Sequence, residues 1–160
     1  MATMKFQGLD QYVVVLERLT NNAGEYIGKT LYVGAGVVAD AIKQEVMALP
    51  ADDRPYSKDI IKNGPTSVQK KGLVDSFGIT KVRVKGGTYD EKLGFDGYNN
   101  IRSKRWPKGQ PNVMVARSIE SGTSWMKKNP FIAKAVRASK VQAEIAMEKE
   151  LDKQIELLMK

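Results

Sequence analysis

The most concentrated chemistry in this sequence is a short basic run around one tryptophan. Arg102, Lys104, Arg105 and Lys108 flank Trp106. Guanidinium and ammonium groups neutralise phosphates, and an indole ring can stack on a base. The run is therefore the best candidate for a surface that faces nucleic acid. An exposed turn anchored by its tryptophan would explain the same residues.

Catalytic groups are otherwise scarce. The 160 residues include no Cys and no His, which excludes Ser-His-Asp and Cys-His nucleophiles and the usual zinc sites. The Gly86-Gly87 pair lacks the Gly-Lys-Ser/Thr ending of a phosphate-binding loop. No pairing typical of a two-carboxylate hydrolase is legible among Glu17, Glu45, Glu91 and Glu120. We therefore expect no enzyme activity, no cofactor, no metal and no small-molecule substrate.

The charge balance is basic, with 26 Lys and Arg against 18 Asp and Glu and a net charge of +8. Such an excess favours acidic partners, nucleic acid among them, although a basic soluble surface would have the same composition. No apolar run approaches the roughly 18 residues that span a bilayer. Residues 1–6 lack the apolar core of a signal peptide. We expect a protein made in a cytoplasm, with no membrane partner.

A second informative stretch, residues 109–132, resembles a packed structural joint. Residues 112–121 predict a short helix, with a strand as the alternative, and Gly122 supplies the left-handed conformation that closes a helix. A new helix then begins with Asn129 as its N-cap and a proline at its first position. We interpret this stretch as a structural corner made by Glu120, Gly122, Thr123, Pro130 and Phe131.

The remaining elements follow from hydrophobic spacing. Helical periodicity predicts helices over 9–19 and 23–48, separated by a break at Asn21-Asn22. Gly28, Gly34 and Gly36 give the second helix a small-residue surface, which suits either close approach of another backbone or a loosely wound helix. Residues 50–66 predict a long projecting loop. Residues 66–76 form a short helix, capped by Thr66 or Ser67, or an extended arm.

Period-two alternation predicts a β-hairpin over about 79–96 with its turn at Gly86-Gly87. The last helix, 129–159, would be roughly 45 Å long at 1.5 Å per residue. A single domain of this length has a radius of gyration of only about 15 Å, so we expect part of that helix to project or to lie on a neighbour. The predicted fold is α+β, a single domain over 1–160 with a small antiparallel sheet packed on two N-terminal helices and the long C-terminal helix.

Interface candidates lie at the corner and on this last helix. Aromatic and methionine side chains are enriched at the centres of interfaces, although ordinary core packing is the alternative reading. We expect Phe131 in the core. The expected contacts with partners are Trp125, Met126, Leu151, Ile155 and Leu158.

In its order of motifs, the chain resembles the lambdoid-phage gene-product-ten family of head–tail joining, or tail-completion, proteins. The likeness is carried by residues 8–10, 34–42, 71–79 and 93–98. It is strongest in the Ala–x–x–Ile–Glu–x–Gly–Thr signature of residues 116–123, followed by Pro130-Phe131-Ile132. The resemblance implies an α+β structural component of a long-tailed phage or prophage.

Such a protein would be assembled in the host cytoplasm and located in the virion. It would form a ring, for which we expect six copies, at the neck or tail top, touching neighbouring neck and tail proteins and, non-specifically, the passing DNA. The family has no catalytic residues to carry over. The alternative from another class is a basic nucleic-acid-binding module of a mobile element.

Overall fold

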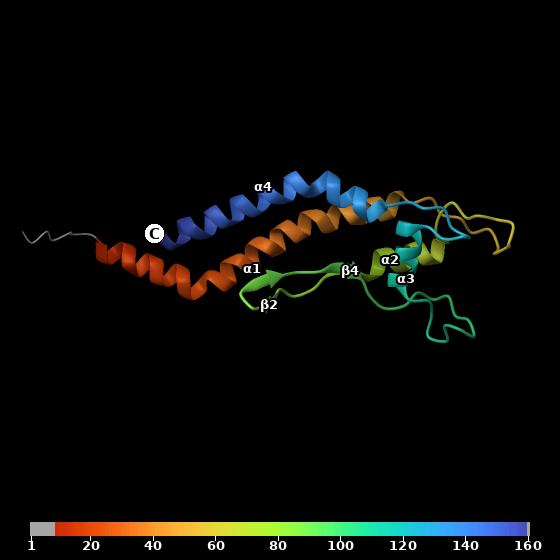
Figure 1. Ribbon diagram of the computed structural model, residues 1–160, viewed down its shortest axis with the longest axis horizontal. Coiled ribbons are helices and arrows are strands. Elements are labelled where there is room, and N and C mark those ends of the chain that lie inside the picture. The colour runs from red at the N-terminus through yellow and green to blue at the C-terminus, as the bar shows by residue number, and fades with distance from the viewer. Residues whose placement is uncertain (1–8, 160) are drawn as a thin grey trace, which may run out of the picture.

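Figure 1 shows an elongated α+β molecule in a computed structural model that describes residues 9–159. Two long helices, α1 (Leu9–Ala48) and α4 (Phe131–Met159), lie side by side over most of its length. The shorter helices α2 (Ser67–Ser76) and α3 (Asn112–Ser121) gather with the irregular loops at one end. We call that end, residues 49–76 and 96–130, the head. The opposite end, residues 13–30 of α1 and 144–159 of α4, is the tip.

The N-terminal region is one helix, not the two predicted from the Asn21-Asn22 pair. Thr20 Oγ1 donates to the carbonyl of Leu16 at 2.8 Å, and Asn22 Nδ2 donates to the carbonyl of Arg18 at 3.1 Å. These side chains bond to the preceding helical turn, so they need no break in the helix to satisfy their polar groups. The prediction failed because Asn is only a weak helix breaker when both sides of it propagate a helix. Residues 1–8, the start of the sequence considered above, lie outside the described residues.

The two long helices approach closely because small residues line their contact. Ala39 of α1 and Ala135, Ser139 and Ala143 of α4 are buried. Gly34 receives Met147, since a Cβ added to Gly34 would lie 2.6 Å from both Met147 Cγ and Sδ. Of the three glycines predicted to form a small-residue surface, only Gly34 accommodates α4, and it does so by receiving a side chain. Gly28 faces Val82 of the hairpin and Gly36 faces open space.

The C-terminal helix was predicted to project or to lie on a neighbouring molecule, and the projection is not observed. Nearly the whole of α4 packs along α1, while the first turns of α1 continue past the end of α4 (Figure 1). Helix α4 is as long as predicted, but α1 has 40 residues and gives α4 a packing partner within the same chain. The excess length belongs to α1.

The predicted hairpin is present and consists of two short antiparallel ladders. At its base β1 (Phe77–Ile79) pairs with β4 (Leu93–Phe95), and near its turn β2 (Arg83–Lys85) pairs with β3 (Thr88–Asp90). Gly86 and Gly87 have φ values of 58° and 79°. Positive φ at both central residues is what a two-residue turn of the favoured hand requires.

Aromatic packing joins this hairpin to the core at the head end of α1 and α4. The Phe77 and Phe95 ring centroids lie 4.9 Å apart, and Phe95 meets Phe131 edge-on at 6.1 Å. Phe131 is fully buried, as predicted. The other large buried side chains of this core are Ile42, Val46, Leu49, Leu73, Val115, Ile119 and Met126.

Candidate assembly interface

The predicted corner is a real joint between α3 and α4, and Glu120 makes it. Both carboxylate oxygens of Glu120 accept backbone hydrogen bonds at the start of α4, from Ile132 N at 2.8 Å and Ala133 N at 3.0 Å. The free N–H groups of a helix's first turn need such acceptors, and the helix dipole favours a negative charge there. Glu120 therefore fixes the direction in which α4 leaves the corner.

The prediction that Asn129 caps the last helix is wrong. Lys134 N donates to the carbonyl of Pro130 at 3.0 Å, so Pro130 occupies the cap position and α4 begins at Phe131. Proline has no side-chain acceptor to offer, and Glu120 supplies it from the preceding helix. The backbone N–H of Asn129 instead donates to the carbonyl of Ile119 at 2.8 Å, which closes the corner.

Gly122 has the positive φ predicted for it, 74°, but its ψ of 163° lies outside the left-handed helical region. This combination is available almost only to glycine. The position is also crowded, since an added Cβ would lie 2.9 Å from Lys128 Cβ and 3.0 Å from Lys128 Cα. Thr123 follows with a hydrogen bond from its N–H to the carbonyl of Met126 at 2.9 Å.

Met126 is not an interface residue, because it is fully buried in the core. The loop of residues 50–66 draws it inward: Lys62 N donates to the carbonyl of Trp125 at 2.9 Å, and Lys127 N donates to that of Lys62 at 2.8 Å. Trp125 itself is half-buried and packs against the edge of the core. Of the two corner residues proposed for partner contact, only Trp125 retains exposed surface.

The 50–66 loop lies at the far end of the head (Figure 1) and is organised around Asp52. Arg54 donates to both carboxylate oxygens of Asp52, at 2.8 and 2.5 Å, and Asn63 N donates to Oδ2 at 2.9 Å. Hydrogen bonds from the Arg54 guanidinium and the Asn63 N–H hold the pKa of Asp52 well below its usual value. The loop is thus a built surface with fixed side-chain positions.

Three loops of the head enclose an aromatic groove of about 560 Å³. Tyr56 enters from the 50–66 loop, Ile101 and Trp106 from residues 98–110, and Trp125 from the corner. Gln69 Nε2 of α2 donates to Gln110 Oε1 at 2.7 Å at the groove wall. The groove, defined by these side chains together with Lys62, Thr66 and Ser103, brings together three segments that the sequence suggested separately.

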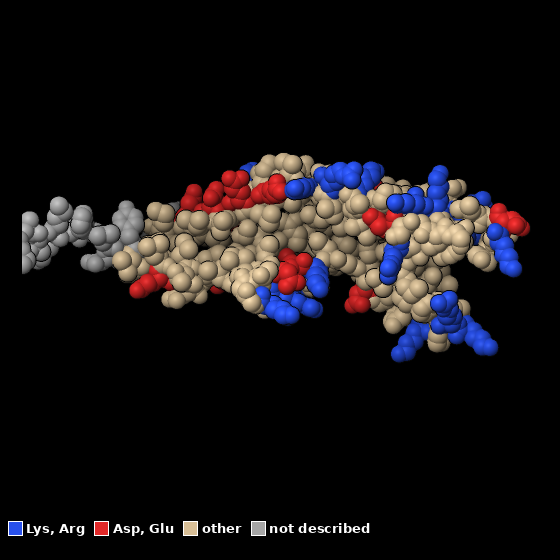
Figure 2. All heavy atoms as spheres, in the orientation of Figure 1, with Lys and Arg blue, Asp and Glu red and all other residues tan. Residues whose placement is uncertain are grey.

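The basic run belongs to the same loop as Ile101, Ser103 and Trp106, which line this groove. Arg102, Lys104, Arg105 and Lys108 are all exposed, and the Arg105 guanidinium carbon lies 5.4 Å from the centre of the Trp106 ring. Figure 2 shows Lys and Arg atoms gathered on this part of the head. These four residues are therefore accessible on one loop, and that loop also lines an aromatic hollow. Contact of these residues with DNA stays a prediction.

At the tip, large apolar side chains face solvent. Leu151 is exposed, while Ile155 and Leu158 are half-buried. The more accessible residues are Leu157, 60% exposed, and Met159, 67% exposed, which the sequence reasoning did not select. They were missed because Leu157 and Met159 lie outside the helical spacing of the predicted apolar stripe, which ran through Leu151, Ile155 and Leu158.

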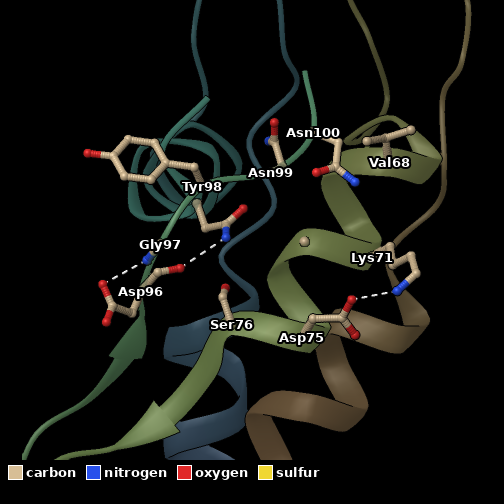
Figure 3. Close-up of a pocket in the computed structure, with 11 residues that line it drawn as sticks. Val68, Lys71, Asp75, Ser76, Asp96, Gly97, Tyr98, Asn99 and Asn100 are labelled. Atoms are coloured by element: carbon tan, nitrogen blue, oxygen red, sulfur yellow. Dashed lines mark hydrogen bonds and ion pairs between the residues drawn. The ribbon is translucent and has the colours of Figure 1, made fainter. Parts of the chain in front are cut away.

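A second hollow of about 630 Å³ lies between α2 and the segment that follows β4. Figure 3 shows Lys71 and Asp75 on one wall and Asp96 and Tyr98 on the other. The polar groups are mostly engaged locally: Lys71 Nζ donates to Asp75 at 2.6 Å, and Gly97 N donates to Asp96 Oδ1 at 2.7 Å.

Deeper in the same hollow, Ser76 Oγ, Asn99 Nδ2 and Asn112 Oδ1 are buried and have no hydrogen-bond partner among residues 9–159. A nucleophilic serine needs a base within hydrogen-bond reach. Ser76 has none in the described part of the chain, so the arrangement does not form a nucleophile–base pair.

Glu91 is a buried carboxyl of the hairpin. Both of its oxygens are shielded from solvent and unpaired among the residues that the structure describes. It lies beside Gly28, Tyr32 and Val82 where the hairpin crosses α1. Burial raises the pKa of Glu91 above its usual value.

In the described residues, no three potential metal-ligating side chains of the Asp, Glu, His or Cys type come together, and no helix is long and apolar enough to cross a bilayer. Compared with protein families, with curated proteins and with solved structures, the chain gives no match.

Proposed function

We propose that this chain is a structural subunit of a long-tailed phage or prophage, which forms a ring at the neck or tail top and joins the tail to the DNA-filled head. The observation that carries the proposal is the exposed apolar surface of the tip, where Leu151, Leu157 and Met159 face solvent on a long helical arm. Leu157 and Met159 lie on different sides of α4, since residues two apart are about 200° apart around a helix, so the whole end of the arm offers apolar surface. Large apolar side chains left exposed together at one end of a molecule mark a surface that another protein covers. The resemblance to head–tail joining proteins supplies the setting.

The shape of the subunit suits this role. The long α1–α4 arm separates two accessible surfaces, the tip and the groove with its basic border, by nearly the whole length of the molecule (Figure 1). An elongated subunit with unlike surfaces at its two ends forms heterologous contacts, which close into a ring when the rotation between neighbours permits. No step of this role needs catalysis, and we propose that the protein is not an enzyme.

In a ring around a channel, the basic border would attract DNA without holding it. Arg102, Lys104, Arg105 and Lys108 are exposed charges, which suit contacts with phosphates, and phosphate contacts carry no sequence information directly. We expect a dissociation constant for DNA no tighter than the roughly 10⁻⁴ to 10⁻⁶ M of non-specific contacts at physiological salt, weakening steeply as salt rises. Fluorescence anisotropy with labelled duplexes of unrelated sequence measures this affinity.

The test of the function is a deletion of the gene in the phage or prophage that carries it. We expect DNA-filled heads and separate tails in electron micrographs, and a large loss of infectious particles that a plasmid copy of the gene restores. An unchanged titre and normal joined particles in the deletion would refute the proposal.

The nucleic-acid-binding module remains the second candidate, because the basic run adjoins exposed aromatic rings as in surfaces that stack bases. Sub-micromolar and sequence-selective DNA binding by the isolated protein would favour that module over the ring subunit.

A further inference from the structure

We propose that the tip of one copy of this chain docks in the aromatic groove of the next copy. The inference rests on the proposed ring function and names the interface that would build the ring. Its occupant is a second copy, chosen because the two surfaces are complementary in both charge and apolar character.

The head carries the positive side of this pairing. Residues 49–76 and 96–130 hold 12 Lys and Arg against 6 Asp and Glu. Four of these basic residues lie on the loop that lines the groove with Ile101, Ser103 and Trp106. The aromatic residues of the groove are accessible, with Tyr56 69% exposed and Trp106 and Trp125 half-exposed. An apolar centre with a charged rim is the usual anatomy of a protein interface.

The tip carries the opposite charge with the same apolar content. Residues 13–30 and 144–159 hold seven Asp and Glu against four Lys and Arg, and Figure 2 shows acidic atoms gathered along the part of α4 nearer its C-terminus. Met159 is exposed on the same side of α4 as Asp152 and Glu156, which precede it by two turns and by one. Leu157 is exposed on another side of the same helix end. The two surfaces are therefore complementary: leucine and methionine of the tip would pack on tryptophan and tyrosine of the groove, and acidic residues would face basic ones.

One molecule cannot satisfy this match by itself, because the groove and the tip lie at opposite ends of a stiff helical arm (Figure 1). Docking therefore runs from head to tip between copies, and every subunit uses two different surfaces. Mixing two variants that each lack a different one of the two surfaces should therefore give a result that an interface between two identical surfaces would not give.

The experiment uses a groove variant, Tyr56→Ala with Trp106→Ala, and a tip variant, Leu157→Asp with Met159→Asp. Each alone is expected to sediment as a monomer, while the unaltered chain forms larger closed assemblies. A 1:1 mixture is expected to give dimers and nothing larger, since each pair retains one intact groove and one intact tip. Val141→Asp, at a site 63% exposed on α4 outside both surfaces, is the matched control and should assemble normally.

Charge reversal tests the pairing at residue level. Arg102→Glu with Arg105→Glu, and separately Asp152→Lys with Glu156→Lys, should each weaken self-association at least about tenfold, which corresponds to about 1.4 kcal/mol. All four changes in one chain should restore assembly, because each reversed groove then meets a reversed tip. Circular dichroism verifies folding, and Tyr56→Ala alone serves if the double groove variant does not fold.

Three results overturn the inference: a groove or tip variant that assembles like the unaltered chain, a mixture that yields no dimers, or an unaltered chain that stays monomeric at about 100 μM. Rings that survive both surface variants would leave the ring function standing and place its interface elsewhere. Failure of the ring function itself shows separately, as normal joined particles in the gene deletion.

Discussion

Replacing Glu120 by alanine should loosen the start of α4 while leaving the rest of the core in place. The change removes two hydrogen bonds to the backbone, those from Ile132 N and Ala133 N at 2.8 and 3.0 Å. Pro130, at the cap position, has no side-chain acceptor that could replace them. The two N–H groups would have to bond to water at the half-buried corner.

The size of the effect follows from two contributions. Losing a side-chain cap costs about 1 kcal/mol, and losing a negative charge at a helix N-terminus costs about 0.3–1 kcal/mol more. We expect Glu120→Ala to lower the free energy of unfolding by about 1.3–2 kcal/mol, and the melting temperature by about 3–8 °C for a chain of this length. Glu120→Gln keeps one acceptor oxygen and should lose roughly half as much.

Thermal unfolding followed by circular dichroism measures the shift, and amide hydrogen exchange locates it. Protection should fall first at Ile132 and Ala133. Ser121→Ala, the exposed neighbour on α3, is the control and should change the free energy of unfolding by less than about 0.5 kcal/mol. If Glu120→Ala has the same melting temperature as Ser121→Ala, the Glu120 carboxylate does not stabilise the corner between α3 and α4.

Two further predictions concern single backbone and side-chain positions. Gly122→Ala should destabilise the protein by about 2 kcal/mol or more, because φ is positive and the new Cβ meets Lys128. Gly36→Ala, with open space around it in α1, should instead stabilise the protein by about 0.5–1 kcal/mol. Equal melting temperatures for the two variants would contradict a special backbone requirement at Gly122. Glu91→Gln should stabilise the protein at neutral pH. Burial raises the pKa of Glu91 in the folded state, so the destabilisation caused by its charge is absent below the ordinary pKa of 4.5 and fully present above the raised pKa. The gain in unfolding free energy from Glu91→Gln, measured by chemical denaturation, should therefore vanish in acid. A gain that does not change with pH would argue against the buried charge as its cause.

Local chemistry in the sequence was enough to predict much of the fold. The hairpin turn followed from Gly86-Gly87 and the α2 cap from Thr66, whose side chain accepts from Gln69 N while Gln69 returns the bond to Thr66 N. The positive φ of Gly122 followed from its place after a helix. In each case the decisive interaction joins residues within four positions of one another, where spacing in the sequence carries the information.

Contacts between distant residues could not be predicted in the same way. Met126 looked like an interface residue because nothing in its neighbours reveals that Lys62, from another loop, draws its backbone inward. The role of Glu120 was hidden because its partners lie 12 and 13 residues ahead, and Asn129 was a sufficient local explanation. The groove was missed as a unit for the same reason: Tyr56, Trp106 and Trp125 come from three loops that only the folded chain assembles.

The antiparallel course of α1 and α4 also has a mechanical consequence. The start of α1 and the end of α4 lie at the same end of the molecule (Figure 1). Tension applied between them would peel the two helices apart one turn at a time, with little resistance. Load applied between tip and head instead runs along both helix axes, parallel to their backbone hydrogen bonds, and must break many side-chain contacts together. The molecule should therefore resist a force along its length better than a force that separates the start of α1 from the end of α4.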